Sequence, residues 1–332
     1  MSRLSMPEIA FNRGRLLVNG RNVTMVALLC VVMLALAIAA HPLTNGVFYK
    51  ASNLTNIMKQ WPSQGYGLIA IGMLFVILTG GIDLSVGSVL SFSGTVAALL
   101  SLDFGLPVWL CMSVGIASGV VLGAINGFLV ARFDLAPFVV TLATMTTIRG
   151  LCQVLSDVAV RPTDPAFPGV TKFNLFGIFP SGMLVLVAFV VVATVFLNRT
   201  PLGRSTIAIG GNRETVRLAG ISVNRGIMTA YMISGLCAGV AGVVFASRSG
   251  QIQPSGAGLA FELDAIAACV IGGASLMGGK GNIRGMMAGM VVLILMNNIL
   301  SLRSVQSFYQ QVLKGLIIIL VILIQSRSRQ RE

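Results

Sequence analysis

The sequence predicts an all-α polytopic membrane protein of about ten transmembrane helices, with both termini on the cytoplasmic side. Three observations support this fold class. Hydrophobic residues occupy 55% of the 332 positions and charged residues only 10%, against about 25% charged in an average soluble domain. The apolar residues form long runs without the alternation of a transmembrane β-strand. The basic residues gather between alternate runs.

Ten apolar runs have about the length needed to cross a bilayer. They divide the chain into a tail over 1–22, one transmembrane domain over 23–325 and a basic tail over 326–332. The first run follows four arginines, as in a signal peptide, but its length favours an uncleaved helix. The expected spans are 23–40, 65–82, 86–102, 107–130, 137–156, 180–197, 227–247, 264–278, 285–301 and 310–325.

The positions of lysine and arginine predict the orientation. If the first segment is cytoplasmic and the runs alternate, fifteen of these residues fall on the cytoplasmic side and six on the outer side. Cytoplasmic segments of membrane proteins are enriched in positive charge, so both termini are expected inside. The clusters GIDLS (81–85) and ELDAI (262–266) lie near the third run of each half, at opposite sides of the membrane. This placement is compatible with an inverted five-helix repeat.

Asp83 is the only charged residue between Gly65 and Leu102. An ionisable side chain within a membrane is costly, and the glycines around Asp83 permit a helix to break where its backbone meets protein or water. We therefore expect Asp83 and Ser85 at a break that faces the interior of the bundle. The residues leave two roles open. Asp83 either lines or gates a pathway, or it caps a helix that begins near Leu84.

A second acidic pair, Glu262 and Asp264, begins the eighth run. Negative charge is favoured there by the dipole of a helix N-terminus. A structural or gating role is favoured over catalysis by paired carboxylates, because no nucleophile or base accompanies them. Lys314, one turn into the last run, is expected to extend to the membrane interface. Arg149 either does the same or pairs with a carboxylate.

The segment 198–226 is long, basic and cytoplasmic by the charge distribution. Asn212 is suited to cap a short helix, with Glu214 in its first turn and Gly220 at its end. Arg217 contributes to the polar face of this helix. The residues alone leave open whether the segment is a solvated connector or a docking helix for a cytoplasmic partner.

Several activities are disfavoured by missing motifs. The stretch GGASLMGGKGNIRG (272–285) lacks the hydroxyl residue that follows the lysine of a phosphate-binding loop. The chain has neither a G-x-S-x-G nor an H-E-x-x-H motif, and its five cysteines form no C-x-x-C pair. We therefore expect a non-catalytic chain without a metal or other cofactor. The net charge of +13 is explained by cytoplasmic helix ends rather than by nucleic-acid binding.

Six stretches carry a resemblance to a known family. They resemble, in the same order, the permease subunits of bacterial ATP-binding-cassette importers for ribose, xylose, arabinose, galactose and related monosaccharides. The resemblance covers most of the chain from the second run onward. The stretches are GMLFVILTGGIDLSVGSVL (72–90), PFVVTLATM (137–145), LGRSTIAIGGN (202–212), GLCAGVAGVV (235–244), ELDAIAACVIGGASLMGGKG (262–281) and SFYQQVLKG (307–315).

This resemblance implies a multi-pass protein of the bacterial inner membrane, surrounded by lipid, that pairs with a second permease copy, usually identical. It implies a cytoplasmic double ATPase that binds ATP and magnesium, and an extracytoplasmic sugar-binding protein. The segment 198–226 is similar to the loop that docks on the ATPase, which makes Asn212, Glu214, Arg217 and Gly220 docking candidates. The family often has small residues directly after the GGN motif, where this chain has residues 214–216, so the fine contacts differ.

A sugar pathway requires hydrogen-bonding side chains rather than fixed charge. Asn126 and Asn297 therefore join Asp83, Ser85, Glu262 and Asp264 as candidates for lining or gating the pathway. The alternative function is a stand-alone secondary transporter that couples a small polar solute to an ion gradient. That class needs a coupling-ion site near the middle of the membrane, for which Asp83 is the only candidate.

Overall fold

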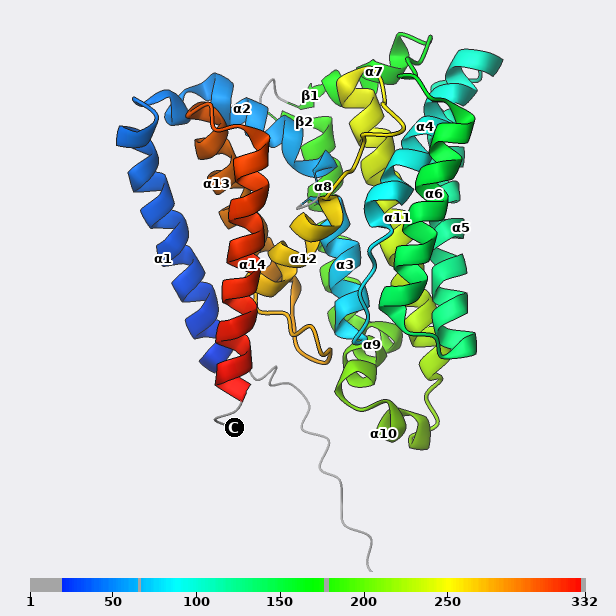
Figure 1. The fold of residues 1–332 in the computed structure, drawn as a ribbon, viewed down its shortest axis with the longest axis vertical. Helices are drawn as coiled ribbons and strands as arrows, with labels where there is room; N and C mark the ends of the chain where they lie inside the picture. Colours follow the sequence, from blue (N-terminus) through cyan, green and yellow to red (C-terminus); the bar gives the residue numbers. More distant parts are fainter. Residues whose placement is uncertain (1–19, 65–66, 176–178, 330–332) are drawn as a thin grey trace, which may run out of the picture.

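The computed structural model describes residues 20–64, 67–175 and 179–329, which are mostly helical (Figure 1). The predicted tail over 1–22 lies outside the described residues except for 20–22, and the predicted tail over 326–332 is helical as far as Arg329, with 330–332 outside the described residues. In chain order the elements are α1 (Gly20–Leu43), η1 (Val47–Tyr49), α2 (Ala51–Gln60), η2 (Trp61–Ser63), α3 (Leu68–Leu78), α4 (Val86–Phe104), α5 (Val108–Phe133), α6 (Pro137–Leu155), α7 (Ala166–Lys172), β1 (Asn174–Leu175), β2 (Phe179–Pro180), α8 (Ser181–Arg199), α9 (Pro201–Gly211), α10 (Arg213–Leu218), α11 (Val223–Ser249), α12 (Phe261–Ile271), α13 (Ile283–Leu302) and α14 (Ser307–Arg329).

Six helices within the described part of the chain are long and apolar enough to cross a membrane. They are α4, α5, α6, α8, α11 and α13, and a seventh span arises if the bent pair of 51–63 and 68–78 is counted as one. Each of the six overlaps a span predicted from the hydrophobic runs. The fold is therefore that of a polytopic helical membrane protein.

Helix α11 lies at the centre of one half of the molecule, against α3, α4 and α5. Its contact with α5 depends on glycine. A Cβ atom added to Gly235 would collide with the carbonyl oxygen of Gly119, and it would lie 2.9 Å from the Cα of Gly123. Small residues at such a crossing allow two helix backbones to approach closely, which is how helices gain packing energy in lipid.

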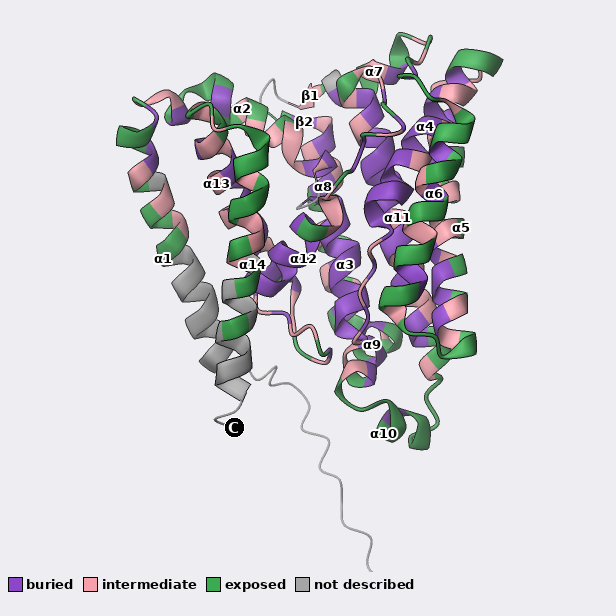
Figure 2. Cartoon of the chain, viewed as in Figure 1, coloured by how far each residue is buried: buried purple, intermediate pink, exposed green. Residues whose placement is uncertain are grey.

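The distribution of exposed apolar side chains separates interior helices from peripheral ones (Figure 2). All eleven residues of α3 are buried, as expected for a helix that is apolar on every side. Helices α5, α6 and α8 instead expose large apolar side chains such as Val121, Val139 and Val192. Lipid chains can cover these faces without cost, because the bilayer core is as apolar as the side chains.

The helices at two of the predicted spans, 65–82 and 264–278, are α3 and α12, and each is only eleven residues long. Eleven helical residues extend about 16 Å, roughly half the hydrocarbon thickness of about 30 Å. Non-helical backbone flanks both helices, over 79–85 after α3 and over 250–260 before α12. The two breaks meet inside the bundle, because a Cβ atom on Gly87 or on Gly258 would collide with the carbonyl oxygen of the other.

Replacing Gly235 with alanine tests the glycine contact between α5 and α11. We expect Gly235→Ala to lower the stability of the detergent-solubilised protein by about 1–3 kcal/mol, because the methyl group overpacks the crossing. Gly150→Ala is the matched control: Gly150 is an exposed glycine within α6, and an added Cβ meets nothing within 4 Å. The measurement is the temperature at which half of the heated protein is no longer monodisperse in detergent. Equal midpoints for the two variants would contradict the packing argument.

Candidate functional site

The helix break at 79–85 is held by a buried polar network. The Asp83 carboxylate is 1% exposed. Its Oδ1 accepts hydrogen bonds from the Ser85 backbone N–H at 3.0 Å and the Ser85 hydroxyl at 2.6 Å, and its Oδ2 accepts one from the Ser234 hydroxyl at 2.8 Å. Asn126 donates from Nδ2 to the Ser85 hydroxyl oxygen at 2.8 Å. The structure therefore brings Asp83, Ser85 and Asn126 together and joins the start of α4 to α5 and α11.

The free backbone at this break is also satisfied by side chains. The Ile82 carbonyl accepts hydrogen bonds from the Thr141 hydroxyl at 3.2 Å and from the Tyr231 hydroxyl at 3.4 Å. A broken helix within a membrane is tolerated only when such groups find partners. Sequence reasoning missed Tyr231 and Ser234, because both lie about 150 positions from the break and only the fold brings α11 beside it.

The second break, over 250–260, is held by side chains from the first half of the chain. Arg149 Nη1 donates to the carbonyl oxygens of Ala257 at 2.6 Å and Pro254 at 3.2 Å. The Ser91 hydroxyl also donates to Pro254 O, at 2.8 Å. Arg149 thus binds irregular backbone, an option that the sequence did not suggest.

Glu262 lies where the two breaks meet. A Cβ atom on Gly87 would be 2.8 Å from Glu262 Oε2, so the absence of a side chain at position 87 makes room for the carboxylate. Glu262 and Asp264 occupy the first turn of α12, as predicted. The two carboxylates have different neighbours: Glu262 lies beside Gly87, whereas Asp264 is buried against α14.

Asp264 and Lys314 form a buried ion pair between α12 and α14. Lys314 Nζ lies 2.8 Å from Asp264 Oδ1, and the two side chains are 19% and 6% exposed. The expectation that Lys314 extends to the interface is therefore wrong. A counter-charge within reach stabilises the ammonium group inside the protein, which removes the need to extend to water.

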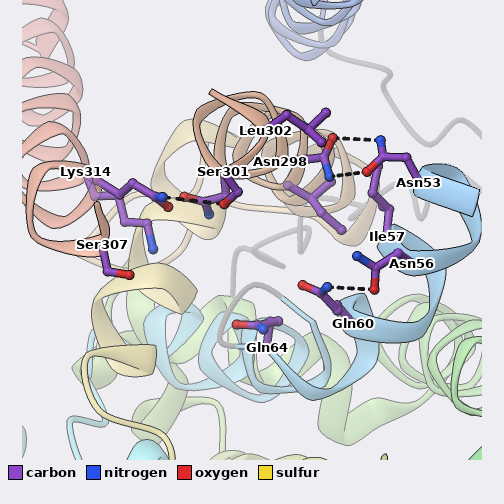
Figure 3. Close-up of a pocket in the computed structure, with 13 residues that line it drawn as sticks. Asn53, Asn56, Ile57, Gln60, Gln64, Asn298, Ser301, Leu302, Ser307 and Lys314 are labelled. Carbon is purple, nitrogen blue, oxygen red and sulfur yellow. Dashed lines mark hydrogen bonds between the residues drawn. The ribbon is translucent and has the colours of Figure 1, made fainter. Parts of the chain in front are cut away.

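A polar cavity of about 390 Å³ lies beside this ion pair, between α2, α13 and α14 (Figure 3). Asn297, predicted as a pathway residue, lies on its wall and is buried. Sequence reasoning treated 41–64 as a connection between spans and missed the contribution of α2. A signal was present, since Asn53, Asn56, Gln60 and Gln64 recur at helical spacing on one face.

The predicted docking segment forms α9 and α10 at the end of the molecule opposite α2 and α7 (Figure 1). Asn212 accepts a hydrogen bond from the Thr215 N–H at 3.0 Å, which confirms it as the N-cap of α10. Glu214 and Arg217 form an exposed ion pair at 2.8 Å. The chain leaves the helix at Gly220, whose φ of 74° suits glycine.

Apolar helices of membrane length, two helices interrupted inside the bundle and an adjoining polar cavity define a polytopic membrane transport protein. The profile of the family described as "Branched-chain amino acid transport system / permease component" matches residues 62–322, and the chain belongs to this permease family. It is accordingly a multi-pass inner-membrane protein and a transport subunit rather than an enzyme.

The chain is similar along most of its length to curated permeases. It is 37% identical to the ribose import permease protein RbsC of Haemophilus influenzae over 94% of each chain. It is 41% identical to RbsC of Bacillus subtilis over 86% of this chain and 88% of the relative. The L-arabinose transport system permease protein AraH of Escherichia coli is 38% identical over 77% of this chain and 78% of its own length. No solved structure matches the chain.

The ion pair between α12 and α14 predicts a rescue experiment. Asp264→Leu or Lys314→Met alone should each destabilise the protein by about 3–5 kcal/mol, because each leaves one buried charge without its partner. The double variant should recover most of that loss, since it buries two apolar side chains instead. The midpoint of thermal unfolding in detergent measures the effect. A double variant as unstable as the sum of the single variants would show that the two side chains act independently.

Proposed function

We propose that the chain is the permease subunit of an ATP-driven, binding-protein-dependent importer of a monosaccharide. The observation that carries this proposal is the near full-length similarity to permeases named for ribose, L-arabinose and xylose. The neutral, amide-rich lining of the cavity supports it, because an uncharged sugar is bound through hydrogen bonds. The sugar itself is selected by a separate extracytoplasmic binding protein, so this chain needs little affinity of its own.

The candidate pathway residues fall into two groups in this proposal. Asp83, Ser85 and Asn126 hold the first break and keep its shape while the bundle moves. Glu262, Asp264 and Asn297 lie between the second break and the cavity, where a gate can open and close. The contact of Gly87 with Gly258 is the point at which the two interrupted segments move past each other.

The proposed architecture has ten crossings in two inverted halves with both termini in the cytoplasm. Figure 1 supports the count, since α1, α14 and the short helices α3 and α12 with their flanking segments also run between the two ends of the molecule. The packing supports the repeat. In such a repeat α3, α4, α5 and α6 of the first half correspond to α11, α12, α13 and α14 of the second. Helix α4 contacts α5, α6 and α11, and its counterpart α12 likewise contacts α13, α14 and α3.

A cytoplasmic double ATPase, which binds ATP and magnesium, docks on α9 and α10 in this proposal. Asn212, Glu214, Arg217 and Gly220 form the exposed part of that surface. Helix α9 also touches the first break and the loop that follows α12. A Cβ atom on Gly278, in the loop after α12, would lie 2.7 Å from Gly80 N and 2.8 Å from Gly210 Cα. Movement of the docking helices would therefore reach the end of α3 and the loop after α12 through direct backbone contact.

The pathway is completed by a second permease copy, and the partner of this chain is most simply another molecule of itself. Helices α5, α6 and α8 expose apolar surfaces that are long enough to span the bilayer. These surfaces can pack against a second copy or against lipid. The extracytoplasmic binding protein meets the opposite end of the molecule from the ATPase.

Sugar uptake by reconstituted vesicles tests the function. Vesicles that contain this chain, its ATPase and its binding protein should accumulate labelled ribose, arabinose or xylose when ATP is present inside and no ion gradient is applied. An ion-coupled transporter makes the opposite forecast, namely accumulation driven by a gradient without ATP. Uptake that requires a gradient and ignores ATP would favour that alternative.

The docking surface makes a separate prediction about coupling. Gly220→Pro cannot adopt the positive φ at this position, so α10 should be displaced and uptake should fall to background while ATP hydrolysis continues. Gly105→Pro is the matched control, because Gly105 is also exposed, has a φ of 59°, and ends α4 at the other side of the molecule. Normal uptake by Gly220→Pro would argue against docking at this segment.

The proposed orientation predicts which positions a membrane-impermeant thiol reagent can reach. A cysteine placed at Thr163, exposed beside α7, should react when the reagent is added outside intact cells. A cysteine placed at Thr215, exposed on α10, should react only after the membrane is opened. The reverse pattern would invert the topology.

A further inference from the structure

The cavity between α2, α13 and α14 has the size of a small-molecule site. Its volume is about 390 Å³, at the lower end of the range of about 300–1,000 Å³ for ligand pockets. It lies toward the end of the molecule that carries α2, away from the docking helices (Figure 1). One small molecule fits such a space.

The walls of the cavity are neutral and hydrogen-bonding. Seven of the thirteen lining residues carry a side-chain amide, two are serines and three are aliphatic. An amide offers both donors and acceptors, as a sugar hydroxyl does. The amides are Asn53, Asn56, Gln60, Gln64, Asn297, Asn298 and Gln310.

Most of these amides are held in place by one another. Asn53 and Asn298 exchange two hydrogen bonds, at 2.9 and 3.0 Å, and Gln60 donates to Asn56 at 2.9 Å (Figure 3). Asn53 also donates to the Phe48 carbonyl at 2.9 Å. The walls are therefore preorganised, which reduces the entropy lost when a ligand binds.

Asn297 differs from these residues. Its side chain lines the cavity and the residue is 8% exposed, yet neither Nδ2 nor Oδ1 has a hydrogen-bond partner among the described residues. Buried polar groups in proteins are nearly always bonded, and an ordered water or a bound ligand is one way in which such an exception is satisfied. A ligand hydroxyl can accept from Nδ2 and donate to Oδ1.

The charge at the wall selects against ions. Among the described residues that line the cavity, Lys314 is the one that carries a charge, and its ammonium group is bonded to Asp264 at 2.8 Å. The pair leaves little net charge for a carboxylate or phosphate ligand. No aromatic side chain is among the thirteen described lining residues, so hydrogen bonds rather than ring stacking are the contacts that these residues offer.

We propose that this cavity is a transit site in which the permease itself binds an uncharged, polyhydroxylated solute of pentose size, with Asn297 as a central hydrogen-bonding residue. The proposal rests on the proposed function and adds a binding site within this chain. Because the separate binding protein sets the affinity for sugar, loss of the transit site should lower the maximal uptake rate rather than raise the KM.

Uptake and thiol protection in the complete reconstituted importer test the proposal. We expect Asn297→Leu and Gln310→Leu each to lower the maximal rate of pentose uptake by about two- to tenfold, the usual worth of one hydrogen bond. Thr194→Val is the control, because its hydroxyl bonds within α8, to Val190 O, and does not line the cavity. In an Asn297→Cys variant, saturating ribose, arabinose or xylose should slow labelling by a maleimide added outside, whereas labelling of Thr163→Cys should not change.

The outcomes separate the two proposals. If the unmodified importer takes up neither a pentose nor galactose, the proposed function is overturned and the transit site with it, whereas uptake of galactose alone overturns only the site of pentose size. If it takes up pentose, but both leucine variants match Thr194→Val, the cavity assignment alone is overturned. Absence of labelling at Asn297→Cys, or labelling that sugar does not slow, overturns that assignment as well.

Discussion

The fold depends on one constraint: every backbone polar group inside the bilayer must find a partner within the protein. Continuous helices meet this constraint by themselves, but α3 and α12 end halfway across the bundle. The chain satisfies the exposed backbone with side chains from distant helices. Thr141 and Tyr231 bind the Ile82 carbonyl, and Arg149 and Ser91 bind the carbonyls of 254–257. Four polar side chains from other helices thus serve the backbone of the two breaks.

The need to satisfy the free backbone groups of each break explains why the two breaks differ in chemistry. The first is short and is closed by a carboxylate with three hydrogen bonds, which ties Ser85 and Ser234 to Asp83. The second is longer and presents carbonyl oxygens, which a guanidinium group satisfies. A compact network of side chains therefore holds the first break, whereas the second is held through its carbonyl oxygens by Arg149 and Ser91.

Features that depend on nearby residues could be predicted from the sequence. The hydrophobic runs located the six long helices, and the pattern Asn212 to Gly220 located α10 with its cap, because a cap depends on a few adjacent positions. The break near Asp83 was also visible, since glycines surround an isolated charge. Features that depend on tertiary contacts were not visible. Lys314 has no acidic neighbour in sequence, and only the packing of α14 on α12 supplies Asp264. The amides of α2 were at helical spacing, but nothing in the sequence placed α13 opposite them.

The pairing of Lys314 with Asp264 has a consequence for transport energetics. Moving one elementary charge across the membrane potential changes the free energy by about 2.3 kcal/mol per 100 mV. Among the described residues that line the cavity, the one ammonium group is compensated by Asp264, and a neutral solute carries no charge of its own through this field. In the proposed importer the membrane potential would therefore neither assist nor oppose the entry of sugar.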